Sequence, residues 1–191
     1  MLFVVRHGQT AANAAGLLLG RADPPLTAIG QRQAEALAIA LPRPDRLLSS
    51  PLHRARDTAA AFGVEVEIDD RWIELDYGEL DGAPVASVTA DLWQRWRADL
   101  GFVPSGGESL RDLGARVREA CAELEPDARD HDVVVVTHVS PIKAAVAWAL
   151  DASDSVVWRM FVEEAAVARI SIGPYGPSLR SFNERYVRPA P

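Results

Sequence analysis

Residues 132–138 read Asp-Val-Val-Val-Val-Thr-His, and they contain the clearest buried strand in the chain. Its consecutive valines place β-branched side chains on both faces, which is typical of a central strand in a parallel sheet that is covered on both sides. The strand ends on His138. Ser140 and Pro141 then stand where an N-cap and a first helical residue are expected, ahead of a helix that runs through Leu150.

The start of the chain has the same design. Leu-Phe-Val-Val at residues 2–5 predicts another buried strand, and Arg-His-Gly-Gln-Thr follows at once at residues 6–10. In open α/β sheets ligands bind outside the carboxyl ends of the strands, so Arg6 and His7 lie where chemistry is expected. Arg6 has a planar set of donors that suits a phosphate, and His7 can act as a nucleophile near neutral pH. The pair indicates phosphoryl chemistry, with a solvated basic dipeptide as the alternative.

The rest of the chain alternates between strand and helix signals. Extended segments are expected at 46–49, 64–68 and 71–75, and as a terminal hairpin at 167–172 and 178–182. Helices are expected after the N-caps Thr27, Ser50 and Ser105, the last in a capping box with Glu108, and as a tryptophan-containing segment at 88–100. In the first of these helices, Ile29, Leu37 and Leu41 share one side. The order predicts an α/β fold: three layers, a mostly parallel doubly wound sheet with helices on both faces, and a C-terminal antiparallel hairpin.

Composition limits the function classes. The chain has 191 residues, of which 48% are hydrophobic, enough for one domain over residues 1–191. A net charge of −7 opposes binding to nucleic acid or to anionic lipid, and no stretch is apolar for long enough to span a membrane. We therefore expect a cytoplasmic protein. The lone Cys121 is expected to be a buried thiol without a catalytic role.

Unusual residues follow three strands of the expected sheet: Arg6 and His7, then Arg54, then His138. The carboxyl ends of adjacent parallel strands lie about 5 Å apart, so these groups can meet in one pocket. Helix N-termini at the same edge favour a bound phosphate there. Arg56 is the alternative to Arg54.

Other polar residues have plainer interpretations. His53 and His131 are expected to be solvated, and the adjacent Asp69 and Asp70 to form a turn, because no histidine stands at metal-ligand spacing from them. The sequence therefore predicts neither a metal site nor a cofactor.

Six motifs in order carry a family resemblance. They are Arg6-His7-Gly8-Gln9-Thr10 with Asn13, Pro25-Leu26-Thr27 with Gly30, Ser49 to Ala59, Glu74 to Gly82, Gly106 to Ser109, and Thr137-His138. With these motifs the chain resembles the histidine phosphatase superfamily, also called phosphoglycerate mutase-like, and in particular its phosphatase branch with the acid phosphatase and α-ribazole phosphatase-like members. The matching residues cover most of the chain.

The resemblance implies a role for each site residue. His7 is expected to be the nucleophile that forms a phosphohistidine, and Glu74 the proton donor. The phosphoryl oxygens are expected to be bound by Arg6, Arg54 and His138, with help from Asn13. Physical reasoning agrees, because two arginines and a protonated His138 can stabilise the charge of a loose transition state without a metal. Without the resemblance, other acidic residues compete with Glu74 for its role: Glu65, Glu67, Glu79 and Asp76.

The leading hypothesis is a phosphomonoesterase that hydrolyses a small phosphorylated metabolite. A phosphoglycerate mutase is the first alternative, but residues 9–13 read Gln-Thr-Ala-Ala-Asn where mutases usually have Glu-Ser and a Trp before the Asn. A catalytically silent binding module is the second alternative, and the full set of site residues argues against it. The substrate is not predicted, and a homodimer is left open.

Residues 76–109 are expected to form a lid over the pocket, with the Gly106-Gly107 pair as a hinge. Trp93 and Trp96 lie three residues apart on one face of the expected helix in this segment. They are expected either to cover the pocket and select substrates, or to belong to the core.

Overall fold

The computed structural model describes residues 1–186 and contains a six-stranded sheet in the order β3-β2-β4-β1-β5-β6. The strands are β1 (Leu2–Arg6), β2 (Arg46–Ser49), β3 (Glu67–Ile68), β4 (Val133–Thr137), β5 (Val167–Gly173) and β6 (Gly176–Glu184). The strands β1 to β4 pair in parallel, whereas β5 pairs antiparallel with both β1 and β6. The expected α/β fold with its C-terminal hairpin is therefore confirmed.

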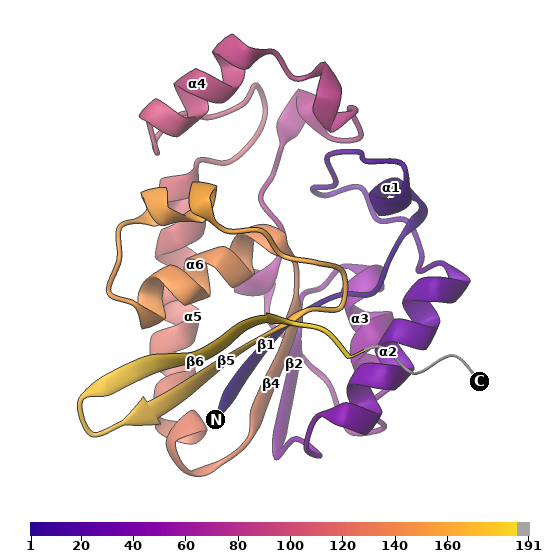
Figure 1. Cartoon of the computed structure of the whole chain (residues 1–191), viewed down its shortest axis with the longest axis vertical. Coiled ribbons are helices and arrows are strands. Elements are labelled where there is room, and N and C mark those ends of the chain that lie inside the picture. The colour runs from indigo at the N-terminus through magenta and orange to yellow at the C-terminus, as the bar shows by residue number, and fades with distance from the viewer. Residues whose placement is uncertain (187–191) are drawn as a thin grey trace.

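Helices cover both faces of the sheet (Figure 1). They are α1 (Ala11–Ala14), α2 (Ala28–Ala40), α3 (His53–Ala60), α4 (Ala90–Ala98), α5 (Leu110–Asp130) and α6 (Val139–Ala149), with 3₁₀ turns η1 (Asp70–Trp72), η2 (Gly78–Leu80), η3 (Val85–Ser87) and η4 (Asp154–Arg159). Alternate strand residues face opposite layers. Val4 and Val135 pack in the core with α5 and α6, whereas Val5 and Val136 pack in the core with α2 and α3.

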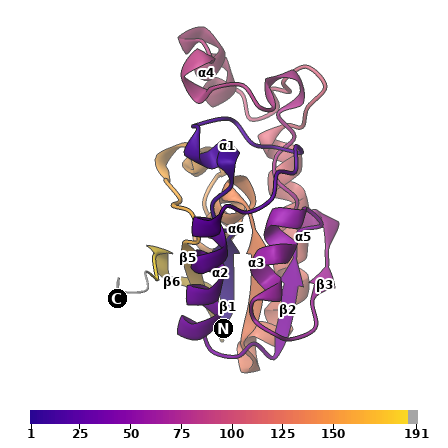
Figure 2. The same cartoon turned by 90° about the vertical axis from the view of Figure 1, so that its right-hand side faces the viewer.

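The helix α4 stands away from the sheet, beyond the carboxyl ends of the parallel strands, in both views of the molecule (Figures 1 and 2). The register of the central strands fixes what lies at that edge. Arg6 pairs with Thr137, and Ser49 pairs with Val136, so β1, β2 and β4 end at the same level. The next residue of each strand therefore enters one shared region.

Three expected helix starts are wrong by a few residues. The N-cap of α3 is Leu52 rather than Ser50, and the N-cap of α6 is His138 rather than Ser140. The helix α5 is capped by Ser109, whose hydroxyl accepts from the Asp112 N–H. The Ser50 hydroxyl lies 2.7 Å from His138 Nε2 and accepts the Leu52 N–H at 3.4 Å, so it bonds just ahead of the helix.

Two other expectations also fail. Residues 71–75 do not form a strand, because Asp69 caps the turn η1 and pairs with the Arg71 guanidinium. The expected strand at 64–68 shrinks to the short edge strand β3. Ile29 is exposed although Leu37 and Leu41 are buried, so only part of the expected apolar side of α2 faces the core.

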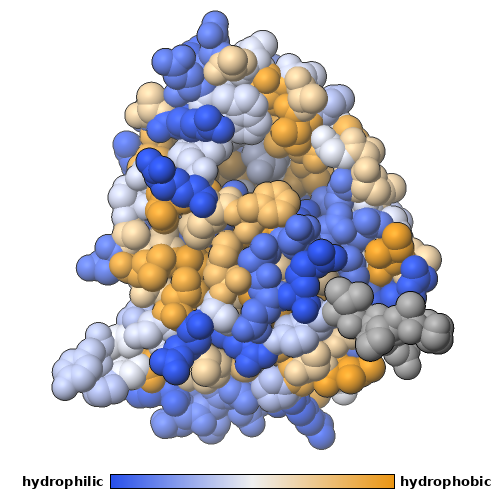
Figure 3. Space-filling model, in the orientation of Figure 1, coloured by the Kyte–Doolittle hydropathy of each residue, from blue (hydrophilic) through white to orange (hydrophobic). Residues whose placement is uncertain are grey.

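The face in Figure 3 carries apolar surface over the region of α6 and η4, next to hydrophilic patches. Phe161, just after η4, is 68% exposed. Within residues 1–186, no helix has the length and apolar character needed to cross a membrane.

Candidate active site

His7 follows β1 directly and is almost fully buried at the carboxyl edge of the sheet. Its N–H donates to the Thr137 carbonyl of β4 at 2.9 Å, which extends the strand pairing by one residue. The next residue is Gly8 because a side chain does not fit there: a Cβ on Gly8 would lie 2.4 Å from the Gly30 carbonyl oxygen. The close approach of these two backbones holds His7 against the start of α2.

The hydrogen bonds of the His7 ring define its tautomer. Nδ1 lies 2.7 Å from the Gly8 carbonyl oxygen, so Nδ1 carries the proton and donates it. Nε2 accepts from the Arg54 Nε–H at 3.3 Å, so it carries no proton and its electron pair faces the Arg54 guanidinium. Burial lowers the pKa of His7 well below its usual value, and the positive charges of Arg54 and Arg6 lower it further. His7 is thus a neutral imidazole with its nucleophilic nitrogen beside two guanidinium groups.

Arg54 is fully buried on the first turn of α3, and backbone carbonyls satisfy its outer nitrogens. Its Nη1 donates to the Ala22 carbonyl at 2.7 Å, and Nη2 donates to the Gly20 carbonyl at 2.8 Å. The carboxylate of Asp23 lies 3.6 Å from Nη1. Arg56, the alternative in the sequence, is exposed.

Asp81 fixes the loop that carries these carbonyls. Its carboxylate accepts the N–H groups of Gly20, Arg21 and Ala22 at 2.7, 2.9 and 2.7 Å. Asp81 thereby positions the carbonyls that hold Arg54, and Arg54 donates a hydrogen bond to His7. No sequence signal singled out Asp81, because a loop carboxylate that binds backbone has no characteristic spacing.

His138 follows β4 directly and is fully buried beside His7, with 5.0 Å between the ring centroids. Its Nε2 lies 2.7 Å from the Ser50 hydroxyl oxygen. Burial lowers the pKa of His138 well below its usual value, and Arg54 adds to this effect. In the site as it stands, this lowered pKa favours the neutral ring of His138, because the ring is buried among positive charges. The protonated His138 expected in the transition state stays a prediction.

Two nitrogen atoms at the site are buried without a hydrogen-bond partner among the described residues: His138 Nδ1 and Arg6 Nε. Such atoms are uncommon in folded proteins and call for an explanation. Arg6 Nη1 is occupied, since it donates to the Val162 carbonyl at 2.8 Å. Both unpartnered atoms belong to residues that the sequence assigns to the phosphoryl oxygens.

Glu74 is buried at the same edge, after η1. Its Oε1 accepts the N–H of Leu75 at 2.7 Å and the N–H of Ser140, in the first turn of α6, at 3.1 Å. The carboxyl group is thus held between the chain segment at 74–75 and the start of the helix that follows His138. Among the competing acidic residues, Glu65, Glu67 and Glu79 are exposed.

Asn13 lies on the short helix α1, and its side chain is used locally. The carbonyl oxygen accepts from the Thr10 N–H at 3.0 Å and from the Thr10 hydroxyl at 2.9 Å, in a capping box. Asn13 is therefore near the site in the chain but bonded to its own turn.

The remaining polar residues lie as the plainer interpretations predict. His53 and His131 are exposed, and Asp69 forms the cap of η1. Cys121 is buried, and burial raises the pKa of its thiol, which fits a residue without a catalytic role.

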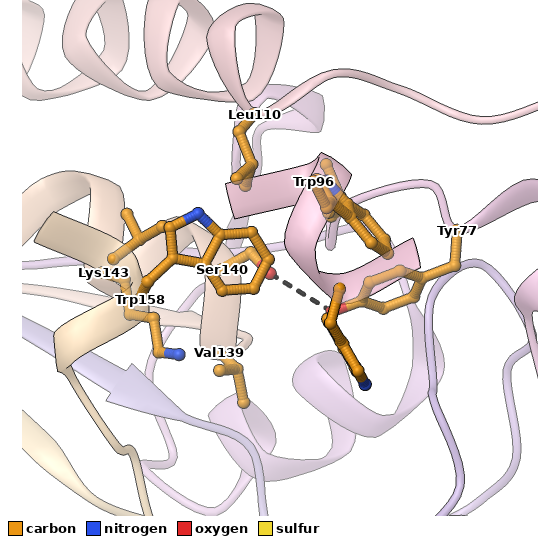
Figure 4. A pocket seen from close by; sticks show the side chains of 10 residues that line it. Tyr77, Trp96, Leu110, Val139, Ser140, Lys143 and Trp158 are labelled. Carbon is orange, nitrogen blue, oxygen red and sulfur yellow. Dashed lines mark hydrogen bonds between the residues drawn. The ribbon is translucent and has the colours of Figure 1, made fainter. Parts of the chain in front are cut away.

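Beside Glu74 lies an apolar pocket of about 130 Å³ (Figure 4). Trp96, on α4, forms one wall, is 1% exposed and stacks on Trp93 at 5.7 Å between ring centroids. Both rings pack against Trp158, and Trp96 also packs against Tyr77. Trp96 is therefore part of the core and of the pocket wall at once, so the two readings of this tryptophan pair are not exclusive.

The two glycines of the expected hinge differ in their surroundings. Gly106 has a φ of +72°, and a Cβ added there would meet no atom within 4 Å. Gly107 is packed, because a Cβ there would lie 2.5 Å from the Asp76 carbonyl oxygen. The Glu108 N–H also donates to that oxygen at 2.9 Å.

The fold and these residues define an α/β protein with a buried cluster of histidines and arginines at the carboxyl edge of its sheet. The family model of the histidine phosphatase superfamily (branch 1) matches residues 2–185, and the chain belongs to this superfamily. The resemblance drawn from the sequence motifs is thereby confirmed.

Curated relatives include several phosphatases. A glucosyl-3-phosphoglycerate phosphatase from Mycobacterium tuberculosis is 38% identical over 160 residues, 75% of this chain and 72% of its own length. A bifunctional protein from the same species is 36% identical over 177 residues, 87% of this chain, so the chain spans about half (49%) of that relative's length. A probable phosphoglycerate mutase from Yersinia enterocolitica is 30% identical over 184 residues, 88% of this chain and 83% of its own length.

A solved structure agrees with the fold over nearly the whole chain. A phosphoserine phosphatase mutant from Entamoeba histolytica, in complex with phosphoserine, superimposes with a TM-score of 0.88 at 25% identity. The match covers 96% of each chain.

Proposed function

We propose that this chain is a metal-independent phosphomonoesterase that acts through a phosphohistidine on His7. The observation that carries the proposal is the state of the His7 ring: buried, neutral, and with its Nε2 electron pair 3.3 Å from the Arg54 guanidinium. A nucleophilic nitrogen beside a fixed positive charge is what attack on a phosphate dianion requires.

The proposed reaction has two steps. His7 Nε2 attacks phosphorus as the ester P–O bond breaks, and Glu74 gives its proton to the departing alkoxide. Glu74, now ionised, takes a proton from water as the water oxygen attacks the phosphohistidine, and His7 leaves as the P–N bond breaks. Arg6, Arg54 and His138 bind the phosphoryl oxygens, and His138 Nδ1 and Arg6 Nε are the buried atoms left for this purpose. Asn13 is proposed to assist.

The substrate is proposed to be a small phosphorylated metabolite. This proposal is supported by relatives named for phosphoserine and glucosyl-3-phosphoglycerate, both carboxylated phosphomonoesters. A mutase remains the second candidate function, with residues 9–13 against it. A single domain over residues 1–191, a lid at 76–109 and a cytoplasmic location also remain proposals.

Replacing the nucleophile tests the reaction. His7→Ala should reduce release of phosphate from 4-nitrophenyl phosphate to background, because a methyl group cannot form the intermediate. Acid-labile, base-stable phosphate should be found on the acid-quenched wild type and be absent from the variant. The matched control is His53→Ala, which removes an exposed histidine and should retain full activity. Substantial turnover by a folded His7→Ala variant would exclude the phosphohistidine.

A further inference from the structure

The apolar pocket has walls from five separate parts of the chain, one of which is Leu110 on α5 (Figure 4). Its lining includes Tyr77, Trp93, Trp96 and Trp158, with Val139, Ser140 and Lys143 from α6. At about 130 Å³ it is close to the size of a cavity that holds one benzene molecule, roughly 150 Å³. The pocket therefore fits one compact apolar group.

The pocket continues from the proposed phosphate site. Leu75 directly follows Glu74 in the chain, and Val139 and Ser140 are the next two residues after His138. Ser140 joins the two regions, because its N–H donates to Glu74 while its hydroxyl lies 3.5 Å from the Tyr77 hydroxyl. A group attached to the ester oxygen, which Glu74 is proposed to protonate, would thus find the pocket next to it.

Lys143 gives this pocket its one cationic side chain. It is the only lysine in the sequence, and it lies on the same face of α6 as Val139, four residues earlier. Lys143 is half-buried, and within residues 1–186 no carboxylate oxygen lies within 4 Å of its ammonium. Glu74, the proposed proton donor, uses its carboxylate to accept hydrogen bonds from backbone N–H groups and not from Lys143.

The surroundings of Lys143 disfavour its charged form. Burial lowers its pKa, Glu74 opposes this shift, and Arg6 adds to it. Glu74 acts on Lys143 by its charge, but no carboxylate oxygen bonds directly to the ammonium. A half-buried ammonium of this kind is stabilised when an anion binds directly beside it, and a carboxylate on a bound ligand would supply that contact.

We infer that this pocket binds the alcohol part of the substrate and that Lys143 pairs with a carboxylate on it. The inference rests on the proposed phosphatase function and specifies its substrate class: a phosphomonoester whose alcohol carries a compact apolar group and a carboxylate. Trp93, Trp96 and Trp158 exclude water from the apolar group, and Lys143 selects for charge.

The test compares esters that differ in one charge. The probes are the carboxyphenyl phosphates, as ortho, meta and para isomers, and the matching neutral carbamoylphenyl phosphates. Wild type should prefer the best carboxylate over its amide by roughly 10- to 100-fold in kcat/KM, as expected for one charge-assisted hydrogen bond. Lys143→Met should abolish the preference through KM, and Lys143→Arg should restore part of it.

Controls separate this role from others. Arg129→Met removes one exposed positive charge from the last turn of α5, at the opposite end of that helix from the pocket residue Leu110. This variant should leave the preference intact. Equal activity of wild type on acids and amides would overturn the inference, and so would equal losses on both in Lys143→Met, which would indicate action through Glu74. Failure of wild type to hydrolyse any of these esters, phenyl phosphate included, would refute the proposed function instead.

Discussion

Arg54 shows how a buried charge can be held ready for chemistry. A guanidinium removed from water is costly unless its donors are satisfied. Two carbonyls of the 20–22 loop accept from its outer nitrogens, the Asp23 carboxylate lies 3.6 Å from Nη1, and Nε faces His7. The same burial that makes this arrangement costly keeps His7 neutral. The burial that positions the Arg54 charge is therefore also what keeps His7 unprotonated and nucleophilic.

Glu74 is proposed to be the proton donor, and its replacement tests this role. Glu74→Gln should slow hydrolysis of ethyl phosphate by roughly 10²- to 10⁴-fold, because a poor leaving group needs a proton. Hydrolysis of 4-nitrophenyl phosphate should slow far less, because its leaving group departs as a stable anion. The measurement is kcat on both esters.

The control for this test is Glu79→Gln, which changes an exposed carboxyl group in the same segment. It should leave both rates unchanged. If Glu74→Gln slowed both esters equally, the proton donor would be another residue, with Asp76 or Glu108 to be examined next.

The sequence predicted the placement of most of the proposed site, and the reason is local. Arg6, His7 and His138 follow buried strands whose pattern is strong, so their position at the sheet edge follows from topology. Ser50 was assigned to a helix cap instead, because its bond to His138 joins residues 88 positions apart. Long-range partners of this kind leave no periodic signal.

At the scale of elements, helix caps were the least predictable feature. The starts of α3 and α6 were misplaced because Leu52 and His138 occupy the N-cap positions without a side-chain hydrogen bond, so no capping residue marks them in the sequence. The start of α5 was misplaced because Ser109, and not Ser105, supplies the capping hydroxyl. The strands β2 and β4 were predicted well because burial on both faces leaves few alternatives.

The loop at 20–22 is an element that Asp81 holds in place. Asp81→Ala should lower kcat/KM for all phosphate esters by a similar factor, about tenfold, because Arg54 loses its fixed carbonyl partners. Unfolding should become easier by about 1–3 kcal/mol, the usual cost of leaving buried polar groups unsatisfied. Kinetics on two unlike esters and a thermal melt measure these effects.

Asp130→Ala, an exposed change at the end of α5, serves as the control and should alter neither quantity. A selective loss on one ester would contradict a role through Arg54, because every phosphate ester uses that residue.

The helix α4 contributes two tryptophans with different expected effects. Trp96→Ala should destabilise the protein by about 3–5 kcal/mol, because Trp96 is fully buried in the core. Trp93 is half-buried, so Trp93→Ala should cost less and act mainly on the pocket. We expect Trp93→Ala to raise KM for phenyl phosphate while KM for ethyl phosphate stays near wild type.

Thermal melts and KM values on the two esters separate these effects. A uniform loss on both esters in Trp93→Ala, with a large fall in Tm, would show that Trp93 is structural and would remove support for a substrate-selecting lid at 76–109.

For the whole molecule, net charge and local charge have opposite signs. The chain carries −7 overall, yet two arginines and two neutral histidines lie in one buried cluster. This contrast keeps the surface unfavourable for polyanions while the site remains suited to a small phosphate. It also ties stability to pH through the two buried histidines.

The folded-state pKa values of His7 and His138 are both lowered, so the unfolded chain binds protons that the folded protein excludes. Stability from this source is fully present above the unfolded pKa of about 6.5 and is lost as pH falls below it. The loss is up to about 1.4 kcal/mol per histidine for each pH unit, and roughly 2–4 °C in Tm per kcal/mol.

Melts between pH 7.5 and 5.5 should show this fall. In a variant with His7→Asn and His138→Asn the fall should shrink, whereas His53→Gln with His131→Gln, two exposed positions, should melt with the wild-type dependence. An equal pH dependence in all three proteins would mean that the buried histidines are not neutral in the folded state, and the proposed activation of His7 would fail with them.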